Sequence, residues 1–157
     1  MSVQYTQRTI EDFLSQMGIS FKSVEVIESE LPEYIKFSID TDESGVLIGK
    51  NGEHLSALSF VIRKVAEKKL GDSTPKFFID VGGYQSNKIQ KIQKVAKIMA
   101  ERAVSFKRDI ELPPMVAYDR LVIHSTLSDF RGVETESEGQ GRFRRVIVRY
   151  RVSDTDL

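Results

Sequence analysis

The segment Gly49-Lys50-Asn51-Gly52 has the residue types and spacing of a phosphate-binding turn. It follows the apolar run Val46-Leu47-Ile48 and opens an amphipathic helical pattern. Glycines leave room for a sugar-phosphate chain to approach the backbone, and a helix start presents unpaired N–H groups and a positive dipole end. Lys50 adds a mobile cation, and Asn51 tolerates turn geometry. The alternative is a plain helix-to-helix turn without a ligand.

A second candidate is the pair Arg120 and His124, four residues apart in a predicted helix. This spacing puts both side chains on one helix face, so they can reach a single ligand. Arginine offers a planar donor fork for phosphate and a face for base stacking. For an isolated pair, the alternative is a surface helix with a satisfied histidine.

The elements that must position the first candidate are read from hydrophobic spacing. We expect a helix over 6–18, strands over 21–28 and 34–40, and a helical turn over 44–48. A longer helix follows, with a core stripe of Leu55, Leu58, Ile62 and Val65, and Gly71 ends it. Residues 77–81 form a buried strand.

A second unit begins near Tyr84 with a long helix. Its apolar stripe is Ile89, Ile92, Ala96, Met99, Ala103 and Phe106. After Pro113-Pro114 we expect a helix over 117–128 and a hairpin of strands 133–138 and 143–150. Tyr84 and Phe106 are expected in the core rather than as stacking platforms.

Several basic side chains admit two interpretations. Lys91, Lys94 and Lys97 either solvate a helix face or contact phosphate. Three arginines near the C-terminus also have two interpretations: they either form ion pairs across the predicted hairpin or contact phosphate. In this set Arg144, Arg145 and Arg149 are the cations, and Glu134, Glu136 and Glu138 are their possible partners.

Charge is unevenly distributed although 23 basic and 23 acidic residues give a net charge of zero. Residues 1–50 hold 4 basic and 9 acidic side chains, residues 51–100 hold 9 and 4, and residues 101–157 hold 10 of each. The basic excess thus begins at the glycine turn, and the local field there decides which ligands are attracted.

Composition excludes several classes of site. The chain has no cysteine and only two histidines, His54 and His124, so disulfides and thiolate chemistry are excluded and no metal site is expected. A Walker-type loop does not fit, because Gly45 and Gly49 are too close and Asn51 follows Lys50. With no apolar signal run and no apolar stretch of membrane-spanning length, we expect a cytoplasmic protein that does not insert into membranes.

The order helix, strand, strand, helix, G-x-x-G, helix, strand is that of a type II KH domain, and residues 45–52 resemble the core motif of that family. The spacing of Arg120 and His124 matches the R-three-H domain. Three further stretches resemble the bacterial Jag family, also called SpoIIIJ-associated or KhpB proteins, which join these two domains. They are residues 114–120, residues 132–139 and the arginine-rich strand 142–148.

The resemblance covers roughly residues 5–151 and implies an α/β (α+β) fold made of two small sheets covered by helices. A KH domain over 1–84 and an R-three-H domain over 85–157 would bind single-stranded nucleic acid. The implied ligand is RNA, in bacterial post-transcriptional control, and the protein would be neither an enzyme nor in need of a cofactor. Its binding residues would be Ile48, Gly49, Lys50, Asn51, Gly52, Arg120 and His124, with Ile48 lining an apolar groove under the bases.

The chain departs from the family pattern at Leu121, where members often carry a second arginine. We also expect it to lack the N-terminal domain and basic linker of many members. The resemblance further implies a small KH-only partner and association with a membrane-protein insertase, so a protein-interaction adaptor is a rival function. Single-stranded DNA is an alternative ligand. A nuclease is a further rival, although no metal-ligand cluster or nucleophile motif supports it.

Overall fold

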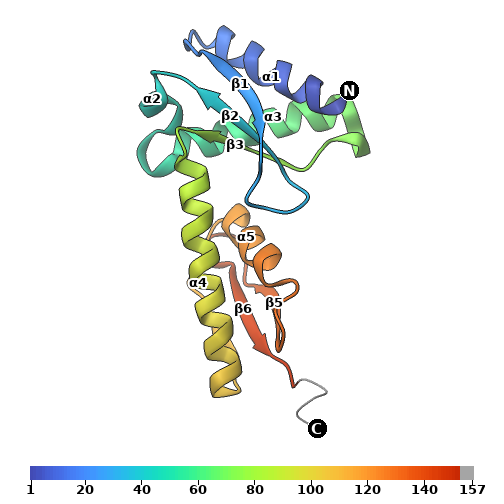
Figure 1. Ribbon diagram of the computed structural model, residues 1–157, viewed down its shortest axis with the longest axis vertical. Helices are drawn as coiled ribbons and strands as arrows, with labels where there is room; N and C mark the ends of the chain where they lie inside the picture. Colours follow the sequence, from blue (N-terminus) through green and yellow to red (C-terminus); the bar gives the residue numbers. More distant parts are fainter. Residues whose placement is uncertain (153–157) are drawn as a thin grey trace. The chain divides into compact units, whose positions relative to one another are not determined.

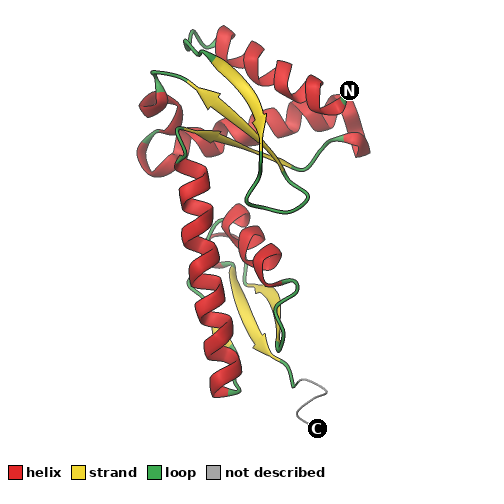
Figure 2. Ribbon diagram, in the orientation of Figure 1, coloured by secondary structure: helices red, strands yellow, loops and turns green. Residues whose placement is uncertain are grey.

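The computed structural model describes residues 1–152. The chain divides into two compact units, Met1–Ser86 (unit 1) and Asn87–Leu157 (unit 2). Each unit contains one three-stranded sheet with helices packed against it, in the order β1-β2-β3 in unit 1 and β4-β6-β5 in unit 2 (Figure 2). The predicted fold class, two small sheets covered by helices, is confirmed.

The elements of unit 1 follow one another in the predicted order (Figure 1). They are α1 (Ser2–Gln16), β1 (Ser23–Ile27), β2 (Ile35–Asp40), α2 (Ser44–Ile48), the 3₁₀ turn η1 (Lys50–Gly52), α3 (Glu53–Leu70), the 3₁₀ turn η2 (Gly71–Ser73) and β3 (Phe77–Val81).

The sheet of unit 1 has an antiparallel and a parallel pair. β1 runs antiparallel to β2, with Val24 opposite Ile39, and β3 runs parallel to β2, with Phe37 opposite Ile79. The parallel pair requires a crossover connection, and α2, η1 and α3 supply it. The glycine turn therefore lies within the crossover. A core shared by the three helices and the sheet holds it in place.

Two details of unit 1 differ from prediction. Helix α1 begins at Ser2 instead of Thr6, because Thr6 is itself fully buried and belongs to the packed face that continues through Ile10. On α3, Val65 is 39% exposed and Ala66 is fully buried, so the core stripe expected at Val65 was wrong by one residue. A spacing of four from Ile62 to Ala66 keeps the stripe on one face of a 3.6-residue helix.

Unit 2 begins within a helix that starts at the end of unit 1. Its elements are α4 (Tyr84–Phe106), β4 (Ile110–Glu111), α5 (Ala117–Leu127), β5 (Val133–Glu138), the 3₁₀ turn η3 (Gly141–Phe143) and β6 (Arg145–Tyr150). The alanines of α4, Ala96, Ala100 and Ala103, let the helix backbone approach the sheet, and they share a core with Ile123 of α5 and Val146 of β6.

Three details of unit 2 differ from prediction. Phe106, expected in the core, is 64% exposed, because α4 ends there and the core face stops at Ala103. The last strand begins at Arg145 rather than Phe143, since residues 141–143 form the turn η3. The strand β4 was not predicted. It is two residues long and pairs with β6 through Ile110 and Glu111, which is too short for an alternation to be visible.

Tyr84 is half-buried against the core of unit 1, as expected. Across residues 1–152, none of the helices combines the length and the apolar character that crossing a membrane requires. Nor do His, Asp and Glu side chains within the same range form a group of three or more that could hold a metal ion.

Candidate nucleic-acid interface

The turn between α2 and α3 has a backbone conformation that requires glycine. Gly49 has φ 70° and ψ −177°, a region that is essentially restricted to glycine. Asn51 (φ 54°, ψ 23°) and Gly52 (φ 76°, ψ 15°) are left-handed, which asparagine and glycine tolerate better than other residues. The segment 49–52 thus has the residue types that its backbone demands.

Two aromatic rings pack against the glycines of this turn. A Cβ on Gly49 would lie 2.5 Å from Cγ of His54, and a Cβ on Gly52 would lie 2.9 Å from Cε1 and Oη of Tyr84. The His54 ring is itself fixed, because its Nδ1 lies 2.7 Å from the carbonyl oxygen of Val46. The two rings therefore support the turn from the protein side.

The outer part of the turn is open to solvent. Lys50 and Asn51 are exposed, while Gly52 is buried and its amide donates to the Gly49 carbonyl at 3.3 Å. Backbone hydrogen bonds in the turns, loops and caps of residues 1–152 include none from the Lys50 or Asn51 amides. These two donors precede the 18-residue helix α3, where amides and helix dipole favour an anion.

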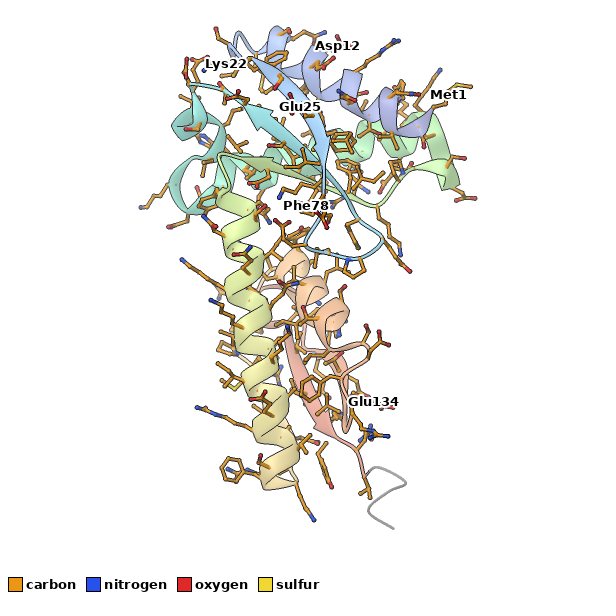
Figure 3. The ribbon with its side chains drawn as sticks, in the orientation of Figure 1. Met1, Asp12, Lys22, Glu25, Phe78 and Glu134 are labelled. Carbon is orange, nitrogen blue, oxygen red and sulfur yellow. The ribbon has the colours of Figure 1, made fainter. Side chains whose placement is uncertain are left out.

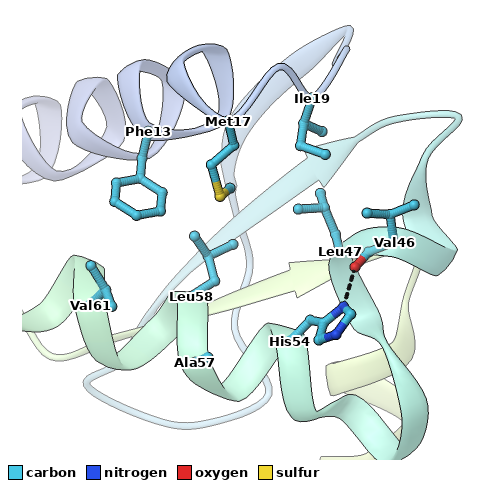
Figure 4. Close-up of a pocket in the computed structure, with 9 residues that line it drawn as sticks. All are labelled: Phe13, Met17, Ile19, Val46, Leu47, His54, Ala57, Leu58 and Val61. Carbon is cyan, nitrogen blue, oxygen red and sulfur yellow. Dashed lines mark hydrogen bonds between the residues drawn. The ribbon is translucent and has the colours of Figure 1, made fainter.

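An apolar groove of about 320 Å³ lies beside the turn (Figure 4). Its lining comes from the end of α1, from the segment that follows α1, from α2 and from α3: Phe13, Met17, Ile19, Val46, Leu47, His54, Ala57, Leu58 and Val61. Ile48, which we expected to line a groove under the bases, is not part of this lining. It is half-buried and packs against the core of unit 1.

In unit 2, helix α5 carries Arg120 in its first turns and His124 one turn later. Arg120 is half-buried, and its Nε donates to the Met115 carbonyl at 3.3 Å. His124 has both ring nitrogens occupied: Nδ1 lies 2.6 Å from Thr135 Oγ1, and Nε2 lies 2.8 Å from Ser137 Oγ. The histidine therefore ties α5 to β5, and neither nitrogen is left over for a ligand.

The surroundings of His124 keep its imidazole neutral. Burial lowers the pKa of His124 below its usual value, and the positive charges of Arg120 and Arg144 lower it further. In the neutral ring one nitrogen donates to a hydroxyl and the other accepts from one. Arg120 and Arg144 are thus close enough to act on the same ring, and the two sequence-predicted residues, Arg120 and His124, are brought together on one side of α5.

The arginines near the C-terminal strand divide into paired and unpaired ones. Arg149 binds Asp109 at 2.9 Å and Glu136 at 2.7 Å, and it also contacts Glu138. Its pKa is raised by these carboxylates, Glu136 first. Arg145 binds Glu111. These two cations are neutralised within unit 2.

Glu134, which extends from β5 in Figure 3, binds Arg151 at 2.9 Å rather than one of the arginines that we weighed for it. Arg144 differs from its neighbours, because it donates to the Gly139 carbonyl at 2.9 Å and forms no ion pair within the described residues. Arg144 is therefore a candidate that the sequence left undecided. Arg144 lies just before β6, whose pairing with β5 begins at Arg145 opposite Glu138, so Arg144 stands outside the strand ladder that carries the ion-paired arginines.

Lys91, Lys94 and Lys97 are exposed on α4. No ion pair links them to a carboxylate in the part of the chain that the structure describes. Both earlier interpretations, a solvated helix face and a phosphate-contacting stripe, therefore stand.

The turn geometry predicts a large difference between two glycines of one segment. Gly49→Ala should lower the free energy of unfolding by about 1–3 kcal/mol, because its backbone conformation excludes other residues and its new methyl group would meet His54. Gly45→Ala should be neutral or slightly stabilising, since nothing lies within 4 Å of a Cβ there and alanine favours helix. Urea denaturation measures both; equal stabilities would contradict this account of the turn.

The surroundings of His124 predict its titration. Because the folded-state pKa lies below the unfolded value near 6.5, the unfolded chain takes up the proton first as pH falls. The free energy of unfolding should therefore decrease as pH drops through 6.5. Two-dimensional NMR of the imidazole gives the pKa directly, and His54→Gln assigns the signal. A midpoint at or above 6.5 would refute the neutral, doubly bonded ring.

Comparison with known proteins identifies both units. Residues 7–75 match the KH domain of KhpA/KhpB, and residues 90–150 match the R-three-H domain. An RNA-binding protein KhpB of Clostridium symbiosum is 32% identical over 126 residues, 80% of this chain and 55% of the relative. KhpB of Lactiplantibacillus plantarum is 30% identical over 118 residues, which are 75% of this chain and 36% of the relative. KhpB of Bacillus subtilis is 25% identical over 129 residues, which are 81% of this chain and 62% of the relative.

The chain spans between about one third and two thirds of the length of these relatives. KH and R-three-H domains are nucleic-acid-binding domains, and all three relatives are named RNA-binding proteins. The resemblance seen in the sequence is confirmed: the chain belongs to the family of tandem KH and R-three-H proteins that includes the KhpB proteins.

Proposed function

We propose that this chain binds single-stranded RNA through two domains, residues 1–84 and 85–157, as a post-transcriptional regulator in the bacterial cytoplasm. The observation that carries the proposal is the turn 49–52. Lys50 and Asn51 are exposed. Their backbone amides donate to no loop or cap carbonyl within the described residues, and helix α3 begins directly after the turn. Such a turn grips the sugar-phosphate backbone of unpaired nucleotides in KH domains.

The rings behind the turn support this role. His54 and Tyr84 fill the space beside Gly49 and Gly52, so the turn keeps its conformation before a ligand arrives. A binding loop that is ordered in advance loses less conformational entropy on binding. Lys50 then contributes charge without having to order the backbone.

In the second domain we assign the phosphate contacts to Arg120 and Arg144. Neither has an ion pair within residues 1–152, whereas Arg145 and Arg149 are satisfied by carboxylates. His124 acts as a positioning residue in this proposal, because its two hydrogen bonds to Thr135 and Ser137 fix the helix that carries Arg120. Leu121 then costs one possible cation and leaves the geometry of the pair unchanged.

Two modest contacts on one chain reinforce one another. Once one domain has bound, the second meets the same strand at a high effective concentration, so the joint affinity exceeds that of either domain. Binding through phosphates releases counterions and therefore weakens as salt rises, with a slope of about −0.7 per contact for single strands. We propose that the chain binds without cleaving, so RNA should remain intact when it is incubated with the protein and magnesium.

A second candidate function is a protein-interaction adaptor, favoured by the apolar groove between α1, α2 and α3. By family resemblance, its partners would be a small KH-only protein or a membrane-protein insertase. Ultraviolet crosslinking in cells separates the two functions: recovered RNA supports the main proposal, and recovered protein partners without RNA support the adaptor. The bound species also separates RNA from single-stranded DNA.

The turn is tested by reversing its charge. Lys50→Asp with Asn51→Asp should weaken binding of a labelled single-stranded RNA at least about tenfold, because about three units of charge change where phosphate is expected. Fluorescence anisotropy gives the affinity, and circular dichroism checks the fold. Lys69→Asp with Ser73→Asp is the matched control, since both residues are exposed and the charge change is equal. Equal affinities for the two double variants would refute the assigned turn.

The second domain is tested by contrasting two arginines. Arg144→Gln should reduce the slope of log affinity against log salt by about 0.7 and lower the melting temperature less than Arg149→Gln, because it loses one hydrogen bond to Gly139 and no ion pair. Arg149→Gln should leave the salt slope unchanged and lower the melting temperature, because the side chain binds Asp109, Glu136 and Glu138 within the fold. Salt titrations and melting curves of both variants decide. An unchanged slope in Arg144→Gln would remove this residue from the interface.

A further inference from the structure

Three phenylalanines in the described chain are mostly exposed and have a cation over the ring. Phe60, Phe106 and Phe143 are 59%, 64% and 63% exposed. The cation of Lys64, Arg108 or Arg142 lies 5.8, 5.5 or 5.1 Å from the respective ring centroid. Single exposed apolar side chains are common on protein surfaces, so exposure alone gives none of these rings a role.

Phe143 differs from the other two in its surroundings. It directly precedes Arg144, and the carbonyl of Arg144 accepts a hydrogen bond from the Met115 amide at 3.2 Å. The Met115 carbonyl in turn accepts from Arg120 Nε at 3.3 Å. Phe143 is therefore the chain neighbour of Arg144, which is linked through Met115 to Arg120, and both of these cations act on the His124 ring.

The other two rings lack this setting. The cation over Phe60 is neutralised, because Lys64 also binds Glu67 at 2.9 Å. Phe106 lies at the end of α4, just before Asp109 and the strand β4, whose Ile110 faces Val148 toward the far end of β6. Phe143 instead precedes the first residue of β6, so the two exposed rings of unit 2 lie toward opposite ends of that strand.

The turn that carries Phe143 is well fixed. The Phe143 amide donates to the Gln140 carbonyl at 3.1 Å, and the Arg144 amide donates to the Gly141 carbonyl at 3.2 Å. The Arg144 side chain closes the turn by donating to the Gly139 carbonyl at 2.9 Å. The ring is thus presented from an ordered backbone, which lowers the entropic cost of using it as a binding surface.

We propose that Phe143 is a stacking platform for an unpaired base, next to phosphate contacts made by Arg120 and Arg144. The inference rests on the proposed RNA-binding function and adds the ligand class of the second domain: a strand with free bases. Bases in a duplex are already stacked on one another and cannot offer a face to the ring. Aromatic stacking is open to every base because each has a π-face, so this contact confers little sequence preference.

The chain contains no tryptophan, and this makes a direct test possible. Phe143→Trp places a single tryptophan, which can be excited selectively over the tyrosines, at the proposed platform, and Phe106→Trp places a matched one at an equally exposed ring. Each variant is titrated with a short single-stranded RNA, with an abasic ribose-phosphate strand of equal length, and with duplex RNA. Anisotropy of the labelled RNA with the unaltered chain is measured in parallel.

The proposal expects single-stranded RNA to quench the tryptophan of the Phe143→Trp variant saturably, with the midpoint that anisotropy gives. The abasic strand, the duplex and the Phe106→Trp variant should give no such quenching. Phe143→Leu keeps an apolar side chain but loses the π-face, and it should weaken binding of single-stranded RNA at least about fivefold while leaving abasic-strand binding unchanged.

Several results would overturn the proposal. If RNA binds with unchanged affinity and the emission of the Phe143→Trp variant stays constant, the stacking role fails and the RNA-binding function stands. Equal quenching by the abasic strand would show phosphate proximity without stacking, and equal quenching in Phe106→Trp would show no specific platform. If anisotropy detects no binding by the unaltered chain, the stacking role and the RNA-binding function fail together.

Discussion

The candidate interface in unit 1 depends on one steric constraint, the contact of two aromatic rings with two glycines. His54 and Tyr84 occupy the volume that side chains at 49 and 52 would need, and the backbone angles at Gly49 exclude other residues independently. The result is a turn that cannot relax inward, because the rings are there. Gly49 and Gly52 also have no side chains that could cover the outer surface of the turn. A close approach by a sugar-phosphate chain requires this bare, outward backbone.

The interface proposed for unit 2 depends on which of its cations are paired. Carboxylates from β4, from β5 and from the residue before β4 neutralise Arg145, Arg149 and Arg151. These pairs are mostly exposed and contribute little to stability individually, but they remove three cations from the field that an anion meets. Arg120 on α5 and Arg144 before β6 are among the cations of unit 2 that form no ion pair within the described residues, and both act on the His124 ring. The neutral ring of His124 adds no charge of its own and fixes the helix instead.

Sequence patterns predicted the fold well where periodicity was long. The order of elements in unit 1 and the helices α4 and α5 follow from apolar spacing, and these were confirmed. Short-range features escaped prediction for physical reasons. The strand β4 has two residues and no period, and Phe106 continues the apolar stripe of α4 although the core beneath that stripe ends at Ala103. A stripe shows which face is apolar and does not show where the partner surface stops.

The candidate site was predictable in its residues but not in their roles. The glycine turn could be located from its motif, whereas the two rings beneath it come from positions with no motif signal, one after the turn and one at the end of unit 1. His124 was identified as a ligand contact, and only the placement of Thr135 and Ser137 opposite its nitrogens shows how it is used. What separates Arg144 from Arg145 is the start of β6: Arg145 lies on that strand and binds Glu111 of β4, whereas Arg144 lies in the turn before it.

Zero net charge is compatible with binding a polyanion when the charges are arranged in this way. A strand of RNA meets the potential within roughly 8–10 Å, the Debye length near physiological salt, and not the total charge of the protein. Cations that are paired with carboxylates contribute little to the potential at that distance, so the cations without such partners contribute most of it. Lys50, Arg120 and Arg144 are such cations, and they are the ones to which we assign the phosphate contacts. With no net charge to attract nucleic acid over longer distances, the preference that we propose for an unpaired strand has to come from the geometry of the glycine turn and of the exposed base platform.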